Sequence, residues 1–242
     1  MAENRRQRML ALLATDRAAR ATSSVGLACA RCVLELSIAG AGATVLAHLG
    51  KGNGDRHPSR GLVYATNEIS AGLEDLQLTV GEGPCLDTFA LGGPVLIADL
   101  AAEGGRWPAF TPAARALGAA AVFSFPLHIG VVRLGSLDLY RDTPGPLTRT
   151  ELTDALILTD VAAQGVVEDL DGHATADVSW LSDPHVEVHQ AAGMVQAQLD
   201  VSTDVALMRL RGYAFTHDVP LAEVARQVVS RSLRFTEDKD AE

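Results

Sequence analysis

The sequence predicts an α+β protein, in which an antiparallel sheet with flanking helices is followed by a small domain of three helices. The first observation behind this prediction is a series of short strand-like segments that are joined as hairpins and bounded by a helix at each end. The second is helical spacing of apolar residues throughout 184–234, after a polar break. With 242 residues, of which 48% are hydrophobic, the chain is long enough to bury a core in one ordinary domain and to add a smaller one.

The first predicted domain covers residues 15–170, after an N-terminal tail at 1–14. Its first helix is expected over 15–37, where small and apolar side chains recur every three or four positions. Strands over 42–50 and 61–67 follow, and the loop between them contains glycine, proline, asparagine and aspartate. These two strands are therefore predicted to form a hairpin.

A short helix over 70–79 follows, with Ser70 as its expected N-cap. The chain then passes through VGEGPCLDTFALGG to a short strand over 94–100. A helical region over 106–118 comes next. Gly118 is expected to end it, because glycine readily adopts the left-handed conformation that closes helices.

Two longer strands, over 120–130 and 131–141, are expected to form a tight hairpin around Gly130. Along both strands apolar side chains alternate with polar ones, so each strand turns an apolar face one way and a mostly polar face the other. The polar face is a candidate ligand pocket, and its residues are Ser124, His128, Ser136 and Asp138. The alternative is a set of hydrogen-bonded polar groups within a covered sheet.

A long helix over 147–170 ends this domain, and Thr148 and Glu151 have capping-box spacing at its start. Together with the first helix it is expected to supply a helical dimer interface. A signal is expected to pass along it into a polar linker over 171–182, which breaks the helical pattern.

The second predicted domain covers residues 183–235 and is followed by an acidic tail at 236–242. Its three helices are expected over 184–199, 203–217 and 220–234. Ser202 is expected to cap the second helix, and Pro220 to lie in the first turn of the third. Three short helices bury little surface alone, so this domain is expected to dimerise.

Three small residues, Ala191, Ala192 and Gly193, lie at the centre of the first of these helices. Glycine inside a helix costs about 1 kcal/mol relative to alanine and needs a packing gain to offset that cost. The three residues therefore predict the close approach of another helix.

The motifs VHQAAGMV, STDVALMRLRGYA and PLAEVARQVV in these helices resemble the ANTAR domain, a three-helix module that binds RNA in bacterial transcription antitermination. The residues that match it in register are Gln190, Ala191, Gly193, Ala206, Leu210, Arg211, Ala214, Leu221, Val224 and Ala225. The preceding domain, through VGEGPCLDTF, GGPVLIADL, RWPAF, FSFPL, LGSLDLYR and LTDALILTDVAA, resembles the GAF domains that precede ANTAR domains in actinobacterial regulators. Together the two resemblances cover about residues 15–235, and the GAF resemblance names no ligand.

The resemblance implies a homodimer that holds paired RNA stem-loops and so prevents a terminator from forming. Proteins read RNA loops through phosphate contacts, stacking on aromatic or arginine planes, and hydrogen bonds to splayed bases. The candidate RNA-binding residues are His189, Gln190, Arg209, Arg211, Tyr213, His217, Arg226, Arg231 and Arg234. The alternative for each arginine is a solvated helix surface, and the alternative for Tyr213 is a place in the core.

Two positions depart from the family's pattern: Ala192, where many members carry lysine, and Val219, where a basic residue precedes the third helix. Residues 177–235 contain five arginines against seven acidic residues, which weakens the electrostatic attraction that dominates nucleic-acid affinity. Two other functions therefore stay open. One is a sensing and protein-interaction module whose ANTAR-like tail serves only dimerisation, and the other is a small-molecule sensor with no nucleic-acid role.

The formal net charge of −10 argues against a protein that coats nucleic acid or anionic membranes non-specifically. The N-terminal segment NRRQRMLALLAT is followed within a few residues by Asp16, Arg17 and Arg20, which is unlike a signal peptide. The 17 uncharged residues between Arg115 and Arg133 are interrupted by glycine and proline. No transmembrane segment is therefore predicted, and a cytoplasmic location is expected.

Three cysteines, Cys29, Cys32 and Cys85, cannot all pair, and they are expected to be reduced. Cys29 and Cys32 have the spacing of a redox or metal pair, with core packing as the alternative. Cys85 precedes an apparent helix, where the pKa of a thiol can fall, with a small buried residue as the alternative. The sequence contains no nucleophile with a paired base, no phosphate-binding loop and no metal motif. We therefore expect no enzyme activity, no catalytic residues, no metal and no cofactor.

Overall fold

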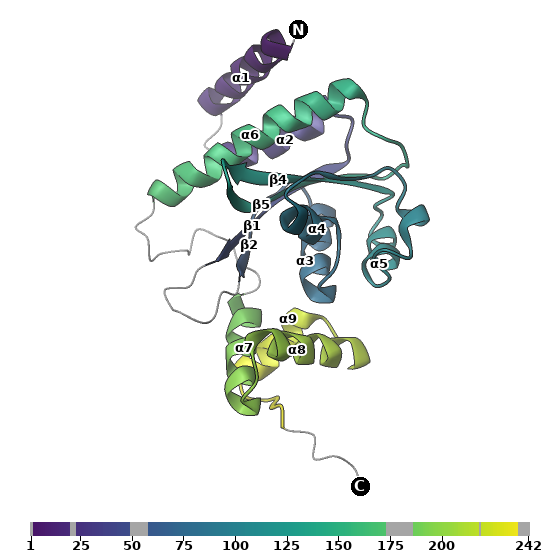
Figure 1. The fold of residues 1–242 in the computed structure, drawn as a ribbon, viewed down its shortest axis with the longest axis vertical. Coiled ribbons are helices and arrows are strands. Elements are labelled where there is room, and N and C mark those ends of the chain that lie inside the picture. Colours follow the sequence, from purple (N-terminus) through teal and green to yellow (C-terminus); the bar gives the residue numbers. More distant parts are fainter. Residues whose placement is uncertain (1, 20–22, 49–57, 173–185, 218, 237–242) are drawn as a thin grey trace. The chain divides into compact units, whose positions relative to one another are not determined.

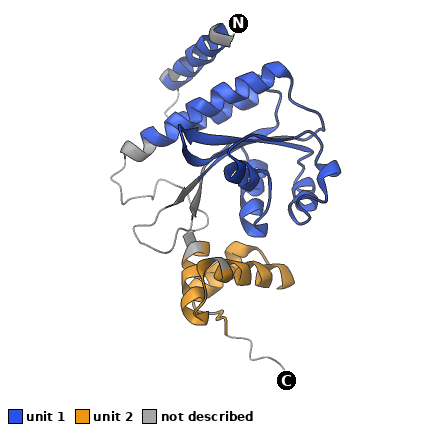
Figure 2. Cartoon of the chain, in the orientation of Figure 1, with its two compact units in different colours: residues 1–47, 60–182 blue, residues 48–59, 183–242 orange. Residues whose placement is uncertain are grey.

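The structure is a computed structural model that describes residues 2–19, 23–48, 58–172, 186–217 and 219–236. The chain divides into two compact units, shown in Figure 2 in different colours. The first comprises residues 1–47 and 60–182, and the second comprises residues 48–59 and 183–242.

A five-stranded sheet with the strand order β2-β1-β5-β4-β3 forms the centre of the first unit (Figure 1). Its strands are β1 Gly40–His48, β2 Pro58–Ala65, β3 Val95–Ile97, β4 Ala121–Ile129 and β5 Val132–Arg141. The pairs β1 with β5, β5 with β4 and β4 with β3 are antiparallel, as the hairpin pattern of the sequence predicts. In this register Ser124 of β4 lies opposite Asp138 of β5.

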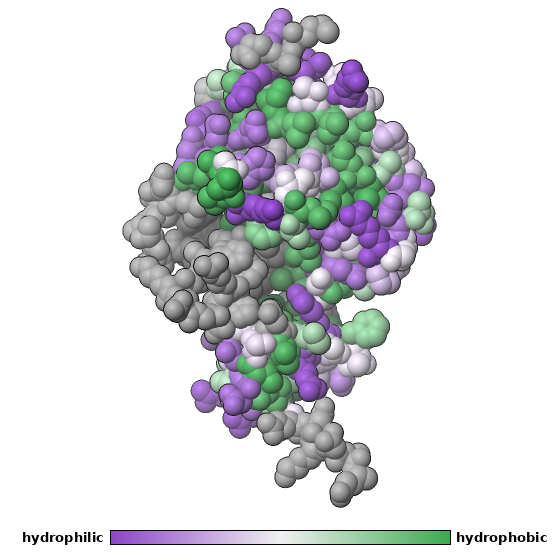
Figure 3. Space-filling model, in the orientation of Figure 1, coloured by the Kyte–Doolittle hydropathy of each residue, from purple (hydrophilic) through white to green (hydrophobic). Residues whose placement is uncertain are grey.

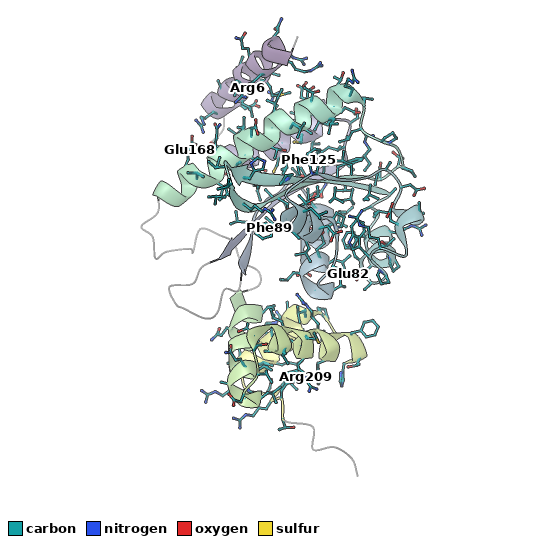
Figure 4. The ribbon with its side chains drawn as sticks, viewed as in Figure 1. Arg6, Glu82, Phe89, Phe125, Glu168 and Arg209 are labelled. Atoms are coloured by element: carbon teal, nitrogen blue, oxygen red, sulfur yellow. The ribbon has the colours of Figure 1, made fainter. Side chains whose placement is uncertain are left out.

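Helices cover both faces of the sheet (Figure 1). On one face lie α2 Ser24–Glu35 and α6 Arg149–Gly172, and on the other lie α3 Glu68–Val80, α4 Pro84–Leu91 and α5 Phe110–Ala116. A short 3-10 helix, η1 Leu100–Glu103, follows β3. The apolar alternation predicted for β4 and β5 places Phe123, Phe125 and Leu137 in the core on the α2 and α6 side, and Figure 4 labels Phe125 there. Val122 and Tyr140 face the second core, beside Trp107 and Phe110.

The N-terminal segment differs from the prediction of one helix over 15–37 after a tail at 1–14. Two helices are present, α1 Ala2–Ala19 and α2. The reason for the new start is the Ser23 side chain, which accepts a hydrogen bond of 3.1 Å from the Gly26 amide and so caps α2. Helix α1 buries Met9 and Leu13 in the same core as α2 and α6, which explains why this segment is helical.

Helices α2 and α6 run side by side in opposite directions. Ser24, at the start of α2, lies so close to Gly165 that a Cβ on Gly165 would be 2.6 Å from the Ser24 Cβ. At the other end, the Arg141 guanidinium donates to the Leu36 carbonyl over 3.1 Å and to the Glu151 carboxylate over 2.7 Å. The start of α2 therefore lies beside the last part of α6.

Helix caps agree with the sequence in part. The predicted capping box of α6 is confirmed, because Thr148 N–H donates to Glu151 over 2.7 Å and Glu151 N–H donates to the Thr148 hydroxyl over 3.2 Å. The N-cap of α3 is Asn67 rather than Ser70, since the Asn67 Oδ1 accepts from the Ser70 amide at 2.8 Å. After α5, Gly118 has φ 103°, the conformation expected of the glycine that ends this helix.

The second unit contains three helices in its described part, α7 Val186–Leu199, α8 Thr203–His217 and α9 Leu221–Val229. They share a core of small and aliphatic side chains, in which Ala191, Leu210 and Val224 are fully buried. Ser202 caps α8 by accepting a hydrogen bond of 3.4 Å from the Val205 amide, as predicted. Helix α9 is shorter than the expected 220–234.

The early end of α9 has a local cause. Ser230 is its C-cap and Arg231 has φ 63°, a left-handed conformation that interrupts the helix. Leu233 and Phe235 then pack against the core of the second unit as an irregular segment. Of the predicted linker at 171–182, the first two residues belong to α6 and the rest lie outside the described residues, as does the acidic tail from 237 onwards.

None of the helices in the described part of the chain combines the length and the apolarity that crossing a membrane requires.

Candidate functional site

The polar face of β4 and β5 is buried beneath α3 and α4. Ser124 and Ser136 are 0% exposed and Asp138 is 7% exposed, although serine and aspartate usually lie at protein surfaces. Helix α4 packs against both strands and α3 packs against β5, so the helices exclude water from this face. The structure thus brings together three of the four predicted pocket residues.

His128 is the fourth, and the structure does not bring it to this cluster. Its side chain is exposed near the end of β4. A register irregularity between Leu127 and His128 interrupts the pairing of β4 with β5. A bulge of this kind breaks the two-residue period on which the prediction depends.

A second acid from α3 meets these residues. Glu74 is 3% exposed, and one of its carboxylate oxygens accepts a hydrogen bond of 2.8 Å from the Thr44 hydroxyl of β1. On β5, the Ser136 hydroxyl donates to Asp138 Oδ2 over 2.6 Å. Each carboxylate therefore has a hydroxyl that holds one of its oxygens.

Asp138 is the electrostatically costly group of the cluster. Burial, followed by the negative charge of Glu74, raises the pKa of Asp138 well above its usual range. Its other oxygen, Oδ1, is buried and has no hydrogen-bond partner among the described residues, and the same holds for the Ser124 hydroxyl opposite. Buried polar atoms without partners are rare and indicate strain, an absent ligand or a chemical role.

The GEGPC segment places a thiol beside these acids. Gly83 has φ 142° and lies against Gln77, so that a Cβ there would be 2.5 Å from the Gln77 Oε1. That same oxygen accepts a hydrogen bond of 2.8 Å from the Cys85 amide. The Cys85 Sγ, a Glu74 oxygen and an Asp138 oxygen all lie within 4.8 Å of one another, and all three residues are buried.

A small cavity adjoins the two acids. It offers about 10 Å³ to the centre of a water molecule, which is room for about one water. Its lining includes Gly42, Ser70, Leu73, Glu74, Gln77, Phe110, Val122, Asp138, Leu139 and Tyr140. In this conformation it is much too small for a nucleotide or a tetrapyrrole.

The other two cysteines lie in the core on the opposite side of the sheet. Cys29 and Cys32 are both 0% exposed on α2, and burial raises the pKa of each thiol above its usual range. The structure therefore gives these residues the core-packing role that the sequence offers as one alternative.

The predicted RNA-binding residues all belong to the second unit. The side chains of Gln190, Arg209, His217, Arg226, Arg231 and Arg234 are exposed, and Figure 4 labels Arg209 on α8. Arg211 and Tyr213 are half-buried, and the His189 side chain lies outside the described residues. The Tyr213 and His217 rings stack at 3.9 Å, and Arg226 pairs with Glu223.

The two positions that depart from the ANTAR pattern have different surroundings. Ala192 is fully buried in the core of the second unit, where a lysine would need to extend its charged end to solvent. Val219 is partly buried against the same core. Gly193 has no atom within 4 Å of its hypothetical Cβ in the described part of the chain, so its small size serves no contact there.

Comparison with solved structures relates the chain to GAF domains. The GAF domain of a phosphoenolpyruvate-protein phosphotransferase from Coxiella burnetii has 17% identity and a TM-score of 0.51, over 71% of this chain and 97% of that one. The corresponding Acinetobacter domain has 12% identity and a TM-score of 0.49, over 71% and 96%. The cyanobacteriochrome TePixJ GAF domain has 15% identity and a TM-score of 0.45, over 64% and 98%. No protein-family model and no curated protein matches the chain.

The first unit therefore has the fold of a GAF domain. At these identities the likeness shows the fold alone, and unrelated functions share a fold.

Several members of the buried cluster escape sequence reasoning. Glu74 and Gln77 lie one turn apart on α3. In the sequence, the leucines of this helix define its buried face, so Glu74 and Gln77 look like ordinary polar residues beside that face. The signal that the sequence does offer is the glycine of GEGPC before Pro84, since a glycine at such a turn often allows a close backbone approach, and the structure shows Gly83 with φ 142° against Gln77.

Proposed function

We propose that the protein is a cytoplasmic transcription antitermination regulator. In it, the GAF-fold unit senses a ligand and controls α7, α8 and α9, which bind paired RNA stem-loops as a homodimer. The observation that carries the proposal is that these three helices form a core of their own from apolar positions of the ANTAR resemblance, namely Ala191, Ala206, Leu210, Ala214, Leu221, Val224 and Ala225. Among the described candidates, Tyr213 packs against that core, whereas the exposed ones stand outside it, namely Gln190, Arg209, His217, Arg226, Arg231 and Arg234.

The surface of α8 is suited to RNA. Arg209 and Tyr213 are one turn apart, and the stacked Tyr213 and His217 rings continue the same line. Unstacked RNA bases stack on aromatic rings and guanidinium planes, and α8 carries both along one edge. Arg231 and Arg234, after α9, supply further exposed positive charge for phosphates.

The test is binding of the purified full-length protein to a transcript that carries two adjacent stem-loops, at several salt concentrations. We expect saturable binding that weakens with salt, and a smaller salt dependence in the Arg209→Ala/Arg211→Ala variant, by about one unit of log–log slope per lost phosphate contact. The matched control is Arg115→Ala/Arg149→Ala, which removes the same charge from exposed positions of the first unit. An equal loss of RNA affinity in both double variants would contradict a specific RNA-binding surface on α8.

A second candidate function is a sensing and protein-interaction module in which the last three helices serve dimerisation alone. The observation in its favour is an apolar stripe on the outer side of α8, where Met208 is 68% exposed and Phe215 is 85% exposed. Figure 3 shows apolar groups among polar ones on the surface of the second unit. A folded dimer that binds none of a panel of host transcripts would favour this candidate over the first.

A further inference from the structure

The cluster of Glu74, Cys85 and Asp138 has the donor atoms of a metal site. Two carboxylate oxygens and one thiol sulfur, from α3, α4 and β5, lie within 4.8 Å of one another. Metal–oxygen bonds of about 2.0–2.2 Å and metal–sulfur bonds of about 2.3 Å let one ion reach all three after a small contraction. Because the three residues come from separate elements, no sequence motif reveals the site. The sequence alone therefore predicts no metal.

Each of the three candidate metal ligands is held in place by a hydrogen bond with a neighbouring residue that is not a candidate ligand. Thr44 donates to one Glu74 oxygen, Ser136 donates to Asp138 Oδ2, and the amide of Cys85 is fixed by Gln77. Such outer partners orient the ligands of protein metal sites. At Asp138 the partner occupies one oxygen only, and Oδ1 is left buried without a hydrogen bond in the described part of the structure.

A second sign of a ligand is that Asp138 Oδ1 and the hydroxyl of Ser124, which is not one of the three ligands, are both buried without a hydrogen bond of normal geometry in the described part of the structure. Asp138 is 7% exposed, and the equally unpartnered Ser124 hydroxyl lies directly across the strand pair from it. The adjoining cavity has room for about one water, which suits an ion with one water ligand and excludes an organic molecule. A cation placed here would satisfy Oδ1 and offset the charge of two buried carboxylates.

We propose that Glu74, Cys85 and Asp138 bind one divalent transition-metal ion of the Zn²⁺ class in the interior of the GAF-fold unit. The mixed donor set decides the class of ion. A thiolate disfavours Mg²⁺ and Ca²⁺, which take oxygen ligands, while two carboxylates disfavour Cu⁺, which takes soft sulfur ligands. The site is independent of RNA binding by α7, α8 and α9, and it would remain if that function failed.

The test uses Co²⁺ as a spectroscopic probe on the full-length protein, reduced and freed of metal by a chelator. We expect one equivalent to produce a near-ultraviolet thiolate-to-cobalt absorption band, and Zn²⁺ to abolish that band by competition. The band should disappear in Cys85→Ser and persist in Cys29→Ser and Cys32→Ser, whose thiols lie in the other core. A wild-type protein without the band, or a band that depends on Cys29 or Cys32 instead, would overturn the proposal.

Two further variants separate metal binding from folding. Thr44→Val removes only the hydrogen bond to Glu74 and should weaken Co²⁺ binding about 10-fold or more, as the loss of an outer partner does in other metal sites. Asp138→Asn keeps the shape of the side chain, and its thermal unfolding should no longer respond to Zn²⁺, whereas the wild-type midpoint should rise. An equal rise in midpoint for both proteins would place the bound ion elsewhere.

Discussion

At the scale of single residues, Asp138 shows how a buried acid links stability to pH. Its pKa is raised when the protein is folded, mainly by burial and next by Glu74, so the folded state holds a proton that the unfolded chain has already released. The stability that protonated Asp138 contributes is fully present at a pH below the carboxyl's usual pKa of about 4. This contribution is lost as the pH rises through the raised pKa of the folded state.

The variant Asp138→Asn should remove this loss. In metal-free protein we expect the wild type to lose stability as the pH rises from about 4, and the variant to lose less, because asparagine has no proton to release. Urea unfolding at a series of pH values measures both. Asp142→Asn, at an exposed position, serves as the control and should follow the wild type. Parallel curves for Asp138→Asn and the wild type would refute this account.

Glu151 illustrates the opposite sign. Burial by itself raises its pKa, but the Thr148 amide and hydroxyl, together with the charge of Arg141, outweigh burial and lower the pKa overall. The stability that this carboxylate contributes is present above its usual pKa of about 4.3 and is lost as the pH falls through the lowered value.

Glu151→Gln should therefore cost roughly 1–3 kcal/mol near neutral pH, because a half-buried charged hydrogen bond to Arg141 is lost. The difference between variant and wild type should shrink as the pH is lowered below about 4, since the wild-type carboxylate is then protonated. Chemical denaturation at neutral and acid pH is the measurement. Glu168→Gln breaks an exposed ion pair with Arg17 and should change little.

At the scale of helices and strands, two glycines in helices predict opposite effects of the same substitution. In α6, a Cβ on Gly165 would approach the Ser24 Cβ to 2.6 Å, so alanine must push α2 and α6 apart. In α7, a Cβ on Gly193 meets nothing within 4 Å in the described residues, so alanine there only improves helix propensity.

We expect Gly165→Ala to destabilise the first unit by about 1–3 kcal/mol despite the better propensity of alanine. Gly193→Ala should stabilise the second unit by up to about 1 kcal/mol. Thermal or denaturant unfolding distinguishes the two. Under the proposed function Gly193→Ala should also weaken RNA binding or dimerisation if either partner approaches this helix closely, and unchanged binding would show that the glycine serves neither.

Much of the fold follows from local patterns, and the site follows only in part. Alternation along 120–141 suffices to place Ser124, Ser136 and Asp138 on one side of the sheet, because the strand period fixes sides. The same period says nothing about which helix covers that side, so Glu74 and Cys85 become visible only in three dimensions. The break between α1 and α2 depends on a serine cap within a region of continuous helical spacing, where periodicity cannot locate an end.

At the scale of the whole molecule, two surfaces compete as the site at which two copies of the chain would meet. The sequence predicts a dimer through the helices at 15–37 and 147–170. In the structure α1 already packs against both α2 and α6, and Arg5 of α1 pairs with Asp154 of α6 over 2.7 Å. The exposed Met208 and Phe215 of α8 offer a different apolar surface.

If the proposed homodimer forms through this surface of α8, the double variant Met208→Ser/Phe215→Ser should shift the protein toward the monomer, because burial of two large apolar side chains across the interface is lost. Sedimentation equilibrium or light scattering at several concentrations measures the shift. Leu91→Ser is the matched control, because Leu91 lies in the first unit with the same 68% exposure as Met208. A dimer that survives the double variant would direct attention back to α2 and α6.

The antiparallel pairing of α2 and α6 has a consequence for how this unit combines with others. Because Ser24 lies beside Gly165, the chain arrives at the sheet and departs from it at neighbouring points. Segments that precede α2 or follow α6 can therefore meet at one edge of this body, where they can contact each other without disturbing the sheet.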